Sequence, residues 1–128
     1  MCMTHAKKVL IVDDDHSLRS LLRENLEAEG LHVLDTENGE SGLKTAFRER
    51  PDIILLDIDM PEMDGIVMLN ILRQNPRGAK IPVVMLTNID DISRVADALE
   101  SESYDYLLKN DTEIRRVIEV VKDRLGLS

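Results

Sequence analysis

Short apolar runs alternate with amphipathic segments along the whole chain, and this alternation constrains the fold more than any other sequence feature. Each run has the length and β-branched content of a buried strand, and each following segment repeats apolar residues at helical spacing. The expected strands cover residues 8–12, 31–36, 52–56, 81–86 and 104–108. The expected helices run from residue 17 to a cap at Gly30 and over residues 39–49, 66–72, 91–100 and 112–125. Strict alternation predicts an α/β fold with one parallel sheet, right-handed crossovers and helices on both faces.

The composition indicates one globular domain with an aliphatic core. Of the 128 residues, 43% are apolar and 32% are charged, and the aromatic residues are Phe47, Tyr104 and Tyr106 alone. Aliphatic side chains suit the strands of a parallel sheet, which is covered on both faces. The net charge of −9 repels a phosphate backbone, so we expect no direct contact with nucleic acid.

The location is predicted from what the sequence lacks. No stretch reaches the roughly 18 to 20 apolar residues that span a bilayer, and residues 1–8 lack the apolar centre of a signal peptide. Cys2, as the single cysteine, has no partner for a disulfide within the chain. We expect a cytoplasmic protein without membrane contact, in which residues 1–7 form a tail and residues 8–128 form the domain.

Polar and charged residues directly follow four of the five expected strands. They are Asp13, Asp14, Asp15, Asp57, Thr87 and Lys109. In open parallel sheets ligands bind outside the carboxyl ends of the strands, so these residues are expected to share one site. Crowded carboxylates stay ionised only when a cation neutralises them, and all-oxygen ligands suit Mg²⁺, with Mn²⁺ as an alternative. His16, next to the acidic triplet, is interpreted as an exposed residue of the first helical turn and not as a ligand.

The same residue types also fit a phosphoryl group. The ammonium of Lys109 and the hydroxyl of Thr87 can donate to phosphate oxygens. An aspartate can itself be the nucleophile and form an acyl phosphate. The residues therefore predict a magnesium-dependent phosphate site, and their spacing alone leaves open which aspartate is attacked.

Four segments resemble the receiver domain of two-component response regulators. They are VLIVDDD at residues 9–15, ILLDIDMPEMDG at 54–65, PVVMLT at 82–87 and YDYLLK at 104–109. The resemblance covers the chain from about Lys8 to Leu125. It implies a flavodoxin-like, doubly wound (βα)5 fold whose five-stranded parallel sheet has the order 2-1-3-4-5.

The resemblance also implies a role for each acidic residue. Asp57 would be the phosphoacceptor, and Asp13 and Asp14 would hold Mg²⁺ together with Asp57, Asp14 being the more direct ligand. Asp59 would add its backbone carbonyl to the metal, and Asp15 would cap the first helix. Pro61 and Gly65 would shape the loop after the acceptor.

Signalling would follow from phosphoryl transfer to Asp57 from a phosphohistidine of a sensor histidine kinase or a histidine phosphotransfer protein. Lys109 would pair with the acceptor carboxylate and then with the phosphoryl group, while Thr87 and Tyr106 would act as the switch. The surface formed by residues 91–100, 104–108 and 112–125 would then bind a downstream effector or a second copy of the chain. Such a protein is a phosphoacceptor, with at most self-catalysed transfer and autodephosphorylation, and not an enzyme with turnover.

The sequence departs from the family pattern at three places. Asn110 replaces the usual proline after Lys109, so we expect a trans peptide there, because a cis bond without proline costs about 3 kcal/mol. Asn88 replaces a small residue after Thr87, and Glu102 and Ser103 replace the usual Gly-Ala. All of the implied acceptor and metal residues are present.

Two alternative functions are weaker. A phosphohydrolase of the haloacid-dehalogenase type would use Asp57 and Asp59 as nucleophile and acid, but its motif ends the first strand, and 128 residues leave no room for a cap domain. A pseudo-receiver that only binds proteins would be expected to lack the acceptor or a metal ligand.

Overall fold

A five-stranded parallel sheet organises the computed structural model, which describes residues 6–87, 105–108 and 114–127. The strands are β1 (Lys8–Val12), β2 (His32–Thr36), β3 (Ile53–Asp57), β4 (Val83–Thr87) and β5 (Asp105–Leu108). Their order across the sheet is β2-β1-β3-β4-β5, and every neighbouring pair is parallel. The predicted doubly wound sheet and its strand order are therefore confirmed.

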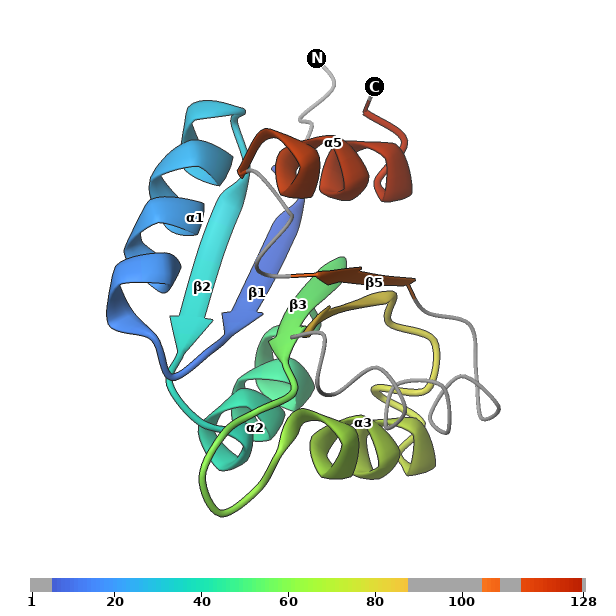
Figure 1. Ribbon diagram of the computed structural model, residues 1–128. Coiled ribbons are helices and arrows are strands. Elements are labelled where there is room, and N and C mark those ends of the chain that lie inside the picture. The colour runs from blue at the N-terminus through green and yellow to red at the C-terminus, as the bar shows by residue number, and fades with distance from the viewer. Residues whose placement is uncertain (1–5, 88–104, 109–113, 128) are drawn as a thin grey trace.

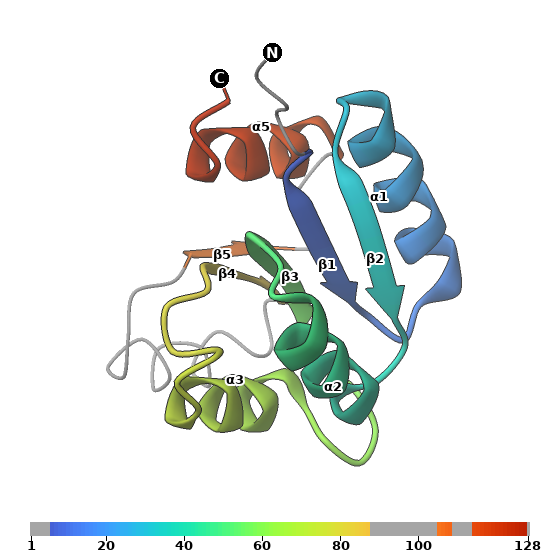
Figure 2. The ribbon, with the colours of Figure 1, turned by 180° about the vertical axis from the view of Figure 1, so that it is seen from behind.

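Helices cover both faces of the sheet (Figures 1 and 2). They are α1 (His16–Ala28), α2 (Gly39–Glu49), α3 (Gly65–Gln74) and α5 (Ile114–Arg124). Helices α1 and α5 lie together on one face, and α2 and α3 lie on the other. The helix expected over residues 91–100 lies outside the described residues.

The core has two halves, one on each face of the sheet. Val9 and Ile11 of β1 pack into the half that α1 and α5 cover, whereas Leu10 and Val12 pack into the half that α2 and α3 cover. Successive strand residues point to opposite faces, so a continuous apolar run serves both halves at once. All four residues are fully buried, which confirms the interpretation of residues 8–12 as a strand covered on both sides.

Local signals set the ends of the first helix as expected. The side chain of Asp15 accepts a hydrogen bond from the backbone N–H of Leu18 at 3.2 Å, which confirms it as the N-cap. Gly30 has a φ of +84°, a left-handed conformation that costs glycine little. The N–H of Leu31 donates to the carbonyl of Leu26, and that of Gly30 to Glu27, which is the Schellman pattern at a helix end.

Several expected boundaries were wrong by one or two residues. Helix α3 begins at Gly65 and not at Ile66, because Asp64 caps it by accepting from the N–H of Val67 at 2.9 Å. Strand β4 begins at Val83 and not at Ile81. The reason is that Arg73 Nη1 donates to the carbonyl of Ile81 at 2.7 Å, while Pro82 has no N–H for the sheet.

The described helices do not include one that is long and apolar enough to cross a bilayer. The described peptide bonds are all trans. The Lys109–Asn110 peptide lies outside the described residues, so its trans geometry stays a prediction.

Candidate metal centre at the carboxyl edge of the sheet

Three of the predicted carboxylates meet where β1 and β3 end. The two strands pair side by side, with Val12 opposite Leu56, so Asp13 and Asp57 emerge at the same edge. Asp13, Asp14 and Asp57 each offer an oxygen, and these oxygens all lie within 4.8 Å of one another. Asp13 is fully buried, Asp57 is 2% exposed, and Asp14 is exposed to solvent.

Backbone N–H groups orient the two buried carboxylates in the same way. Asp13 Oδ1 accepts from the N–H of Asp15 at 2.9 Å, and Asp57 Oδ1 accepts from the N–H of Asp59 at 3.2 Å. Each aspartate thus closes a small turn with the residue two positions later. The backbone N–H of Asp13 in turn donates to the carbonyl of Thr36 at 3.1 Å, which ties the site to the end of β2.

The donor set fits a small hard cation. Three carboxylates this close together repel one another, and a divalent ion relieves that repulsion. Because all three offer oxygen, the site suits Mg²⁺ or Mn²⁺ better than zinc, which prefers nitrogen and sulfur ligands. The exposed position of Asp14 leaves this side of the cluster open to water, which Mg²⁺ keeps in part of its coordination shell.

The loop between β3 and α3 brings the start of α3 into close contact with the backbone of Asp57. The N–H of Gly65 donates to the carbonyl of Ile58 at 2.8 Å. A Cβ atom at Gly65 would lie 2.3 Å from the carbonyl oxygen of Asp57. Glu62 has a φ of +68°, and the N–H of Met63 donates to the carbonyl of Pro61 at 2.8 Å. Only glycine at position 65 allows this approach.

A guanidinium that the sequence did not single out also reaches the site. Arg19 Nη1 donates to the backbone carbonyl of Asp13 at 2.8 Å, and Arg19 Nε lies 3.6 Å from Asp35 Oδ1. Arg23 Nη1 donates to the other oxygen of Asp35 at 2.6 Å, and this hydrogen bond raises the pKa of the Arg23 guanidinium above its ordinary value. The signal available in the sequence was an arginine one turn into a helix that starts directly after the acidic triplet.

The other predicted site residues lie at the same edge or outside the described part of the chain. Asp57 is opposite Leu86, so the backbone of Thr87, the last residue of β4, lies at the same edge as the carboxylates. Thr87 pairs in turn with Leu108, and Tyr106 belongs to β5. Lys109, which follows β5, lies outside the described residues, as do Asn88, Glu102, Ser103 and Asn110. The roles of these residues stay predictions, as does that of the Asp59 carbonyl.

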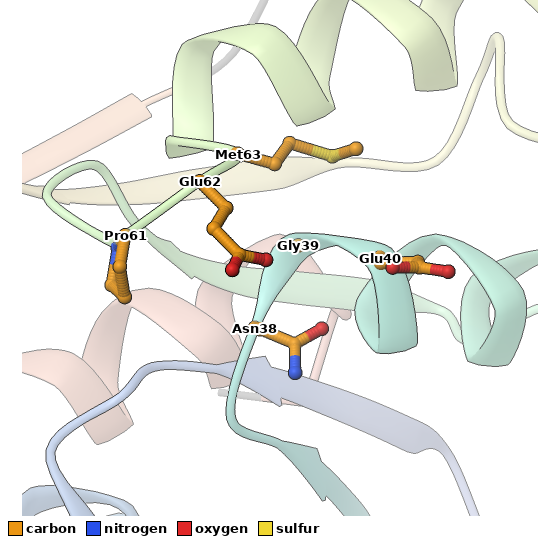
Figure 3. A pocket seen from close by; sticks show the side chains of 6 residues that line it. All are labelled: Asn38, Gly39, Glu40, Pro61, Glu62 and Met63. Carbon is orange, nitrogen blue, oxygen red and sulfur yellow. The ribbon is translucent and has the colours of Figure 1, made fainter.

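A small pocket lies between the start of α2 and the loop that precedes α3 (Figure 3). Its volume is about 170 Å³. The residues that line it are Asn38, Gly39, Glu40, Pro61, Glu62 and Met63. Because the three clustered carboxylates are not among them, the pocket is separate from the candidate metal centre.

Comparison with known proteins shows similarity over most of the chain. The family model described as the response regulator receiver domain matches residues 9–122. The alkaline phosphatase synthesis transcriptional regulatory protein PhoP of Bacillus subtilis (strain 168) is 41% identical over 103 residues, which are 80% of this chain and 42% of PhoP. The chain therefore spans less than half the length of this curated relative.

Solved structures share the fold. The signal receiver domain of a signal transduction histidine kinase from Syntrophus aciditrophicus aligns with a TM-score of 0.85 and 31% identity, over 94% of this chain and 91% of that chain. The receiver domain of the sensor histidine kinase PA1611 from Pseudomonas aeruginosa PAO1 aligns with a TM-score of 0.84 and 23% identity, over 95% of this chain and 99% of that chain. That structure holds a magnesium ion coordinated in the active site cleft. At 23% identity, the similarity concerns the fold alone.

Proposed function

Because this chain belongs to the response regulator receiver family, we propose that it accepts a phosphoryl group on Asp57 and signals by the change that follows. The observation that carries the proposal is the meeting of Asp13, Asp14 and Asp57 at neighbouring strand ends. We assign residues 8–128 to the receiver domain and residues 1–7 to a tail. The meeting of acceptor and acidic pair favours this function over a pseudo-receiver that only binds proteins.

The donor in this proposal is a phosphohistidine of a sensor histidine kinase or a histidine phosphotransfer protein. A carboxylate oxygen of Asp57 attacks the phosphorus, the phosphorus–nitrogen bond breaks, and the histidine leaves with a proton from solvent. The N–H of Asp59 holds Asp57 Oδ1 and so orients the carboxylate before the attack. The chain's own contribution is mainly to position the reacting groups and to balance their charge.

Asp13, Asp14 and Asp57, with the backbone carbonyl of Asp59, would hold Mg²⁺, with Mn²⁺ as an alternative ion. The ion would supply positive charge for the phosphoryl oxygens and lower the repulsion between the carboxylates. Lys109 would contribute a second positive charge at the carboxyl end of β5. Its ammonium would pair with the Asp57 carboxylate before transfer and with the phosphoryl group after it.

We also propose that Thr87 and Tyr106 report the phosphorylated state. Thr87 would donate its hydroxyl to a phosphoryl oxygen, and Tyr106 would turn inward into the space that Thr87 leaves. Thr87 belongs to β4 and Tyr106 to β5, and these two strands pair with each other. The surface of residues 91–100, β5 and α5 would then bind a downstream protein or a second copy of the chain, as expected for a local charge change that biases a two-state surface.

The cellular location of the chain and its lack of contact with membranes and nucleic acid are proposed from its charge and from its relatives. We place it in the cytoplasm, where phosphoryl donors of the sensor kinase type act, and we propose that it makes no contact with membranes. Its net charge of −9 disfavours direct contact with nucleic acid. PhoP is a transcriptional regulatory protein and this chain spans 42% of its length, so we propose the receiver function alone for this chain.

Intact-mass analysis of the chain incubated with acetyl phosphate tests the acceptor. We expect a gain of one phosphoryl group that requires Mg²⁺ and disappears in Asp57→Asn. Asp59→Asn is the matched control, because its carboxylate is exposed and only its backbone is assigned a role; it should still be labelled. Labelling that persists in Asp57→Asn, or wild-type protein that neither gains the group nor binds beryllofluoride, would overturn the proposal.

A further inference from the structure

We propose that Arg19 is a positioning residue for the metal centre, because its guanidinium fixes the peptide unit that joins Asp13 to Asp14. This inference rests on the proposed function, since it concerns the metal site assigned there. Arg19 does not belong to the carboxylate cluster itself. Its effect would therefore pass through the backbone of the two acidic residues.

The hydrogen bonds around Asp13 show why one more donor matters. The N–H of Asp13 is bound to the carbonyl of Thr36, and its Oδ1 is bound to the N–H of Asp15. Arg19 Nη1 adds a further fixed point on the backbone, 2.8 Å from the carbonyl oxygen of Asp13. That oxygen lies in the plane of the peptide joining Asp13 to Asp14, so holding it restricts the directions in which both carboxylates leave the backbone.

The guanidinium is itself held from the other side. Arg19 Nε lies 3.6 Å from Asp35 Oδ1, and Nη2 lies 3.3 Å from His16 Nδ1. The side chain of Arg19 is only 12% exposed and that of Asp35 25% exposed, so solvent and salt screen this pair less than a surface pair. Because a guanidinium is planar and rigid, the ion pair with Asp35 and the contact with His16 together restrict the direction of Nη1, which a lysine ammonium cannot reproduce.

An electrostatic role and a positioning role for Arg19 predict opposite changes in Mg²⁺ affinity when the side chain is removed. A positive charge close to the carboxylates repels an incoming cation, so a purely electrostatic role for Arg19 means that Mg²⁺ binds more tightly once the charge is removed. A positioning role means that Mg²⁺ binds more weakly, because the two carboxylates lose their preset orientation. Residues that orient metal ligands typically contribute about 10- to 100-fold to metal affinity.

Arg23→Ala is a matched control for Arg19→Ala. Both arginines pair with Asp35, and both variants lose an ion pair on the same face of α1. Arg23 Nη1 donates to Asp35 and Arg23 Nε lies 3.5 Å from Glu27 Oε2, whereas Arg19 alone of the two donates to Asp13. Thermal stability should therefore fall in both variants, and the Mg²⁺ affinity should separate them.

The experiment is a Mg²⁺ titration of the 128-residue chain followed by backbone amide NMR shifts, with Arg19→Ala, Arg19→Lys and Arg23→Ala beside the wild type. We expect Kd to rise about 10-fold in Arg19→Ala, about threefold in Arg19→Lys, and to stay within about twofold in Arg23→Ala. Unchanged or tighter binding in Arg19→Ala would overturn the positioning role. If that variant does not fold, unchanged binding in Arg19→Lys would do so. A wild type that binds no Mg²⁺ would instead overturn the metal site of the proposed function.

Discussion

Replacing Gly65 by alanine should push β3 and the loop that follows it away from α3. The new Cβ would lie 2.3 Å from the carbonyl oxygen of Asp57 and 2.9 Å from the Cα of Ile58, whereas Cβ contacts below 3.0 Å essentially do not occur. The backbone must therefore move by at least 0.7 Å, from 2.3 to 3.0 Å. The obstructing atoms belong to the backbone of a buried region, so no side-chain rotation can relieve the contact.

Overpacking of this kind costs about 1–3 kcal/mol, and the helix preference of alanine returns less than about 1 kcal/mol at the first position of α3. We expect a net loss of about 2 kcal/mol in the free energy of unfolding, which is a fall in Tm of roughly 6–10 °C for a domain of this size. Thermal and urea unfolding followed by circular dichroism measure both quantities. Amide NMR shifts at Asp57, Ile58 and Asp59 should change in the same variant.

Gly30→Ala is the control for this prediction. Gly30 has a φ of +84° and nothing within 4 Å of a Cβ, so the substitution introduces backbone strain of about 1 kcal/mol without a collision. It should leave the NMR shifts around Asp57 unchanged. If Gly65→Ala were no less stable than Gly30→Ala and left those shifts in place, the reasoning from close approach would be refuted.

Three further predictions concern caps, loops and the metal. Asp15→Ala should lower the free energy of unfolding by about 1 kcal/mol, because α1 loses its N-cap. In thermal melts Asp15→Asn should keep most of that stability, and an equal loss of stability in the two variants would contradict a capping role. Arg73→Ala should lower the free energy of unfolding in urea by about 2–3 kcal/mol, because Arg73 Nη1 donates to the carbonyls of Gly78 and Ile81. Arg77 is exposed, so Arg77→Ala should lower the free energy of unfolding by less than about 0.5 kcal/mol. Mg²⁺ at about 100 times its Kd should raise the free energy of unfolding by about 2.7 kcal/mol, and the same concentration should stabilise Asp14→Asn much less; equal stabilisation of both proteins would remove Asp14 from the metal centre.

The strands were predictable because each buried strand is a run of consecutive apolar residues in the sequence. Residues 8–12 are apolar at every position after Lys8, and only a strand covered on both faces uses such a run in full. The acidic residues where β1 and β3 end were predictable for a related reason. Parallel strands end at one edge, so a polar residue that ends an apolar run is placed by the topology itself, as the meeting of Asp13 and Asp57 confirms.

The details that escaped prediction depend on contacts between side chains and backbone. The predicted start of β4 was wrong because Arg73, in the preceding helix, donates a hydrogen bond to the carbonyl of Ile81. Arg19 was missed for the same reason, since its bond to the carbonyl of Asp13 leaves no periodic pattern in the sequence. Such bonds need the folded geometry to bring donor and acceptor together, whereas hydrophobic periodicity is visible before folding.

The position of β1 in the sheet has a consequence for how the chain folds as it is synthesised. Strand β1 lies between β2 and β3, and β4 and β5 are then added on the β3 side in chain order. After the first pair forms, each new strand that leaves the ribosome meets a partner that is already in place, and none has to insert between two strands that are already paired. The strand order therefore allows the sheet to extend by addition at one edge, from β1 through β3 and β4 to β5. The carboxylates of Asp13, Asp14 and Asp57 therefore meet once β3 has paired with β1, and their meeting does not depend on β4 or β5 joining the sheet.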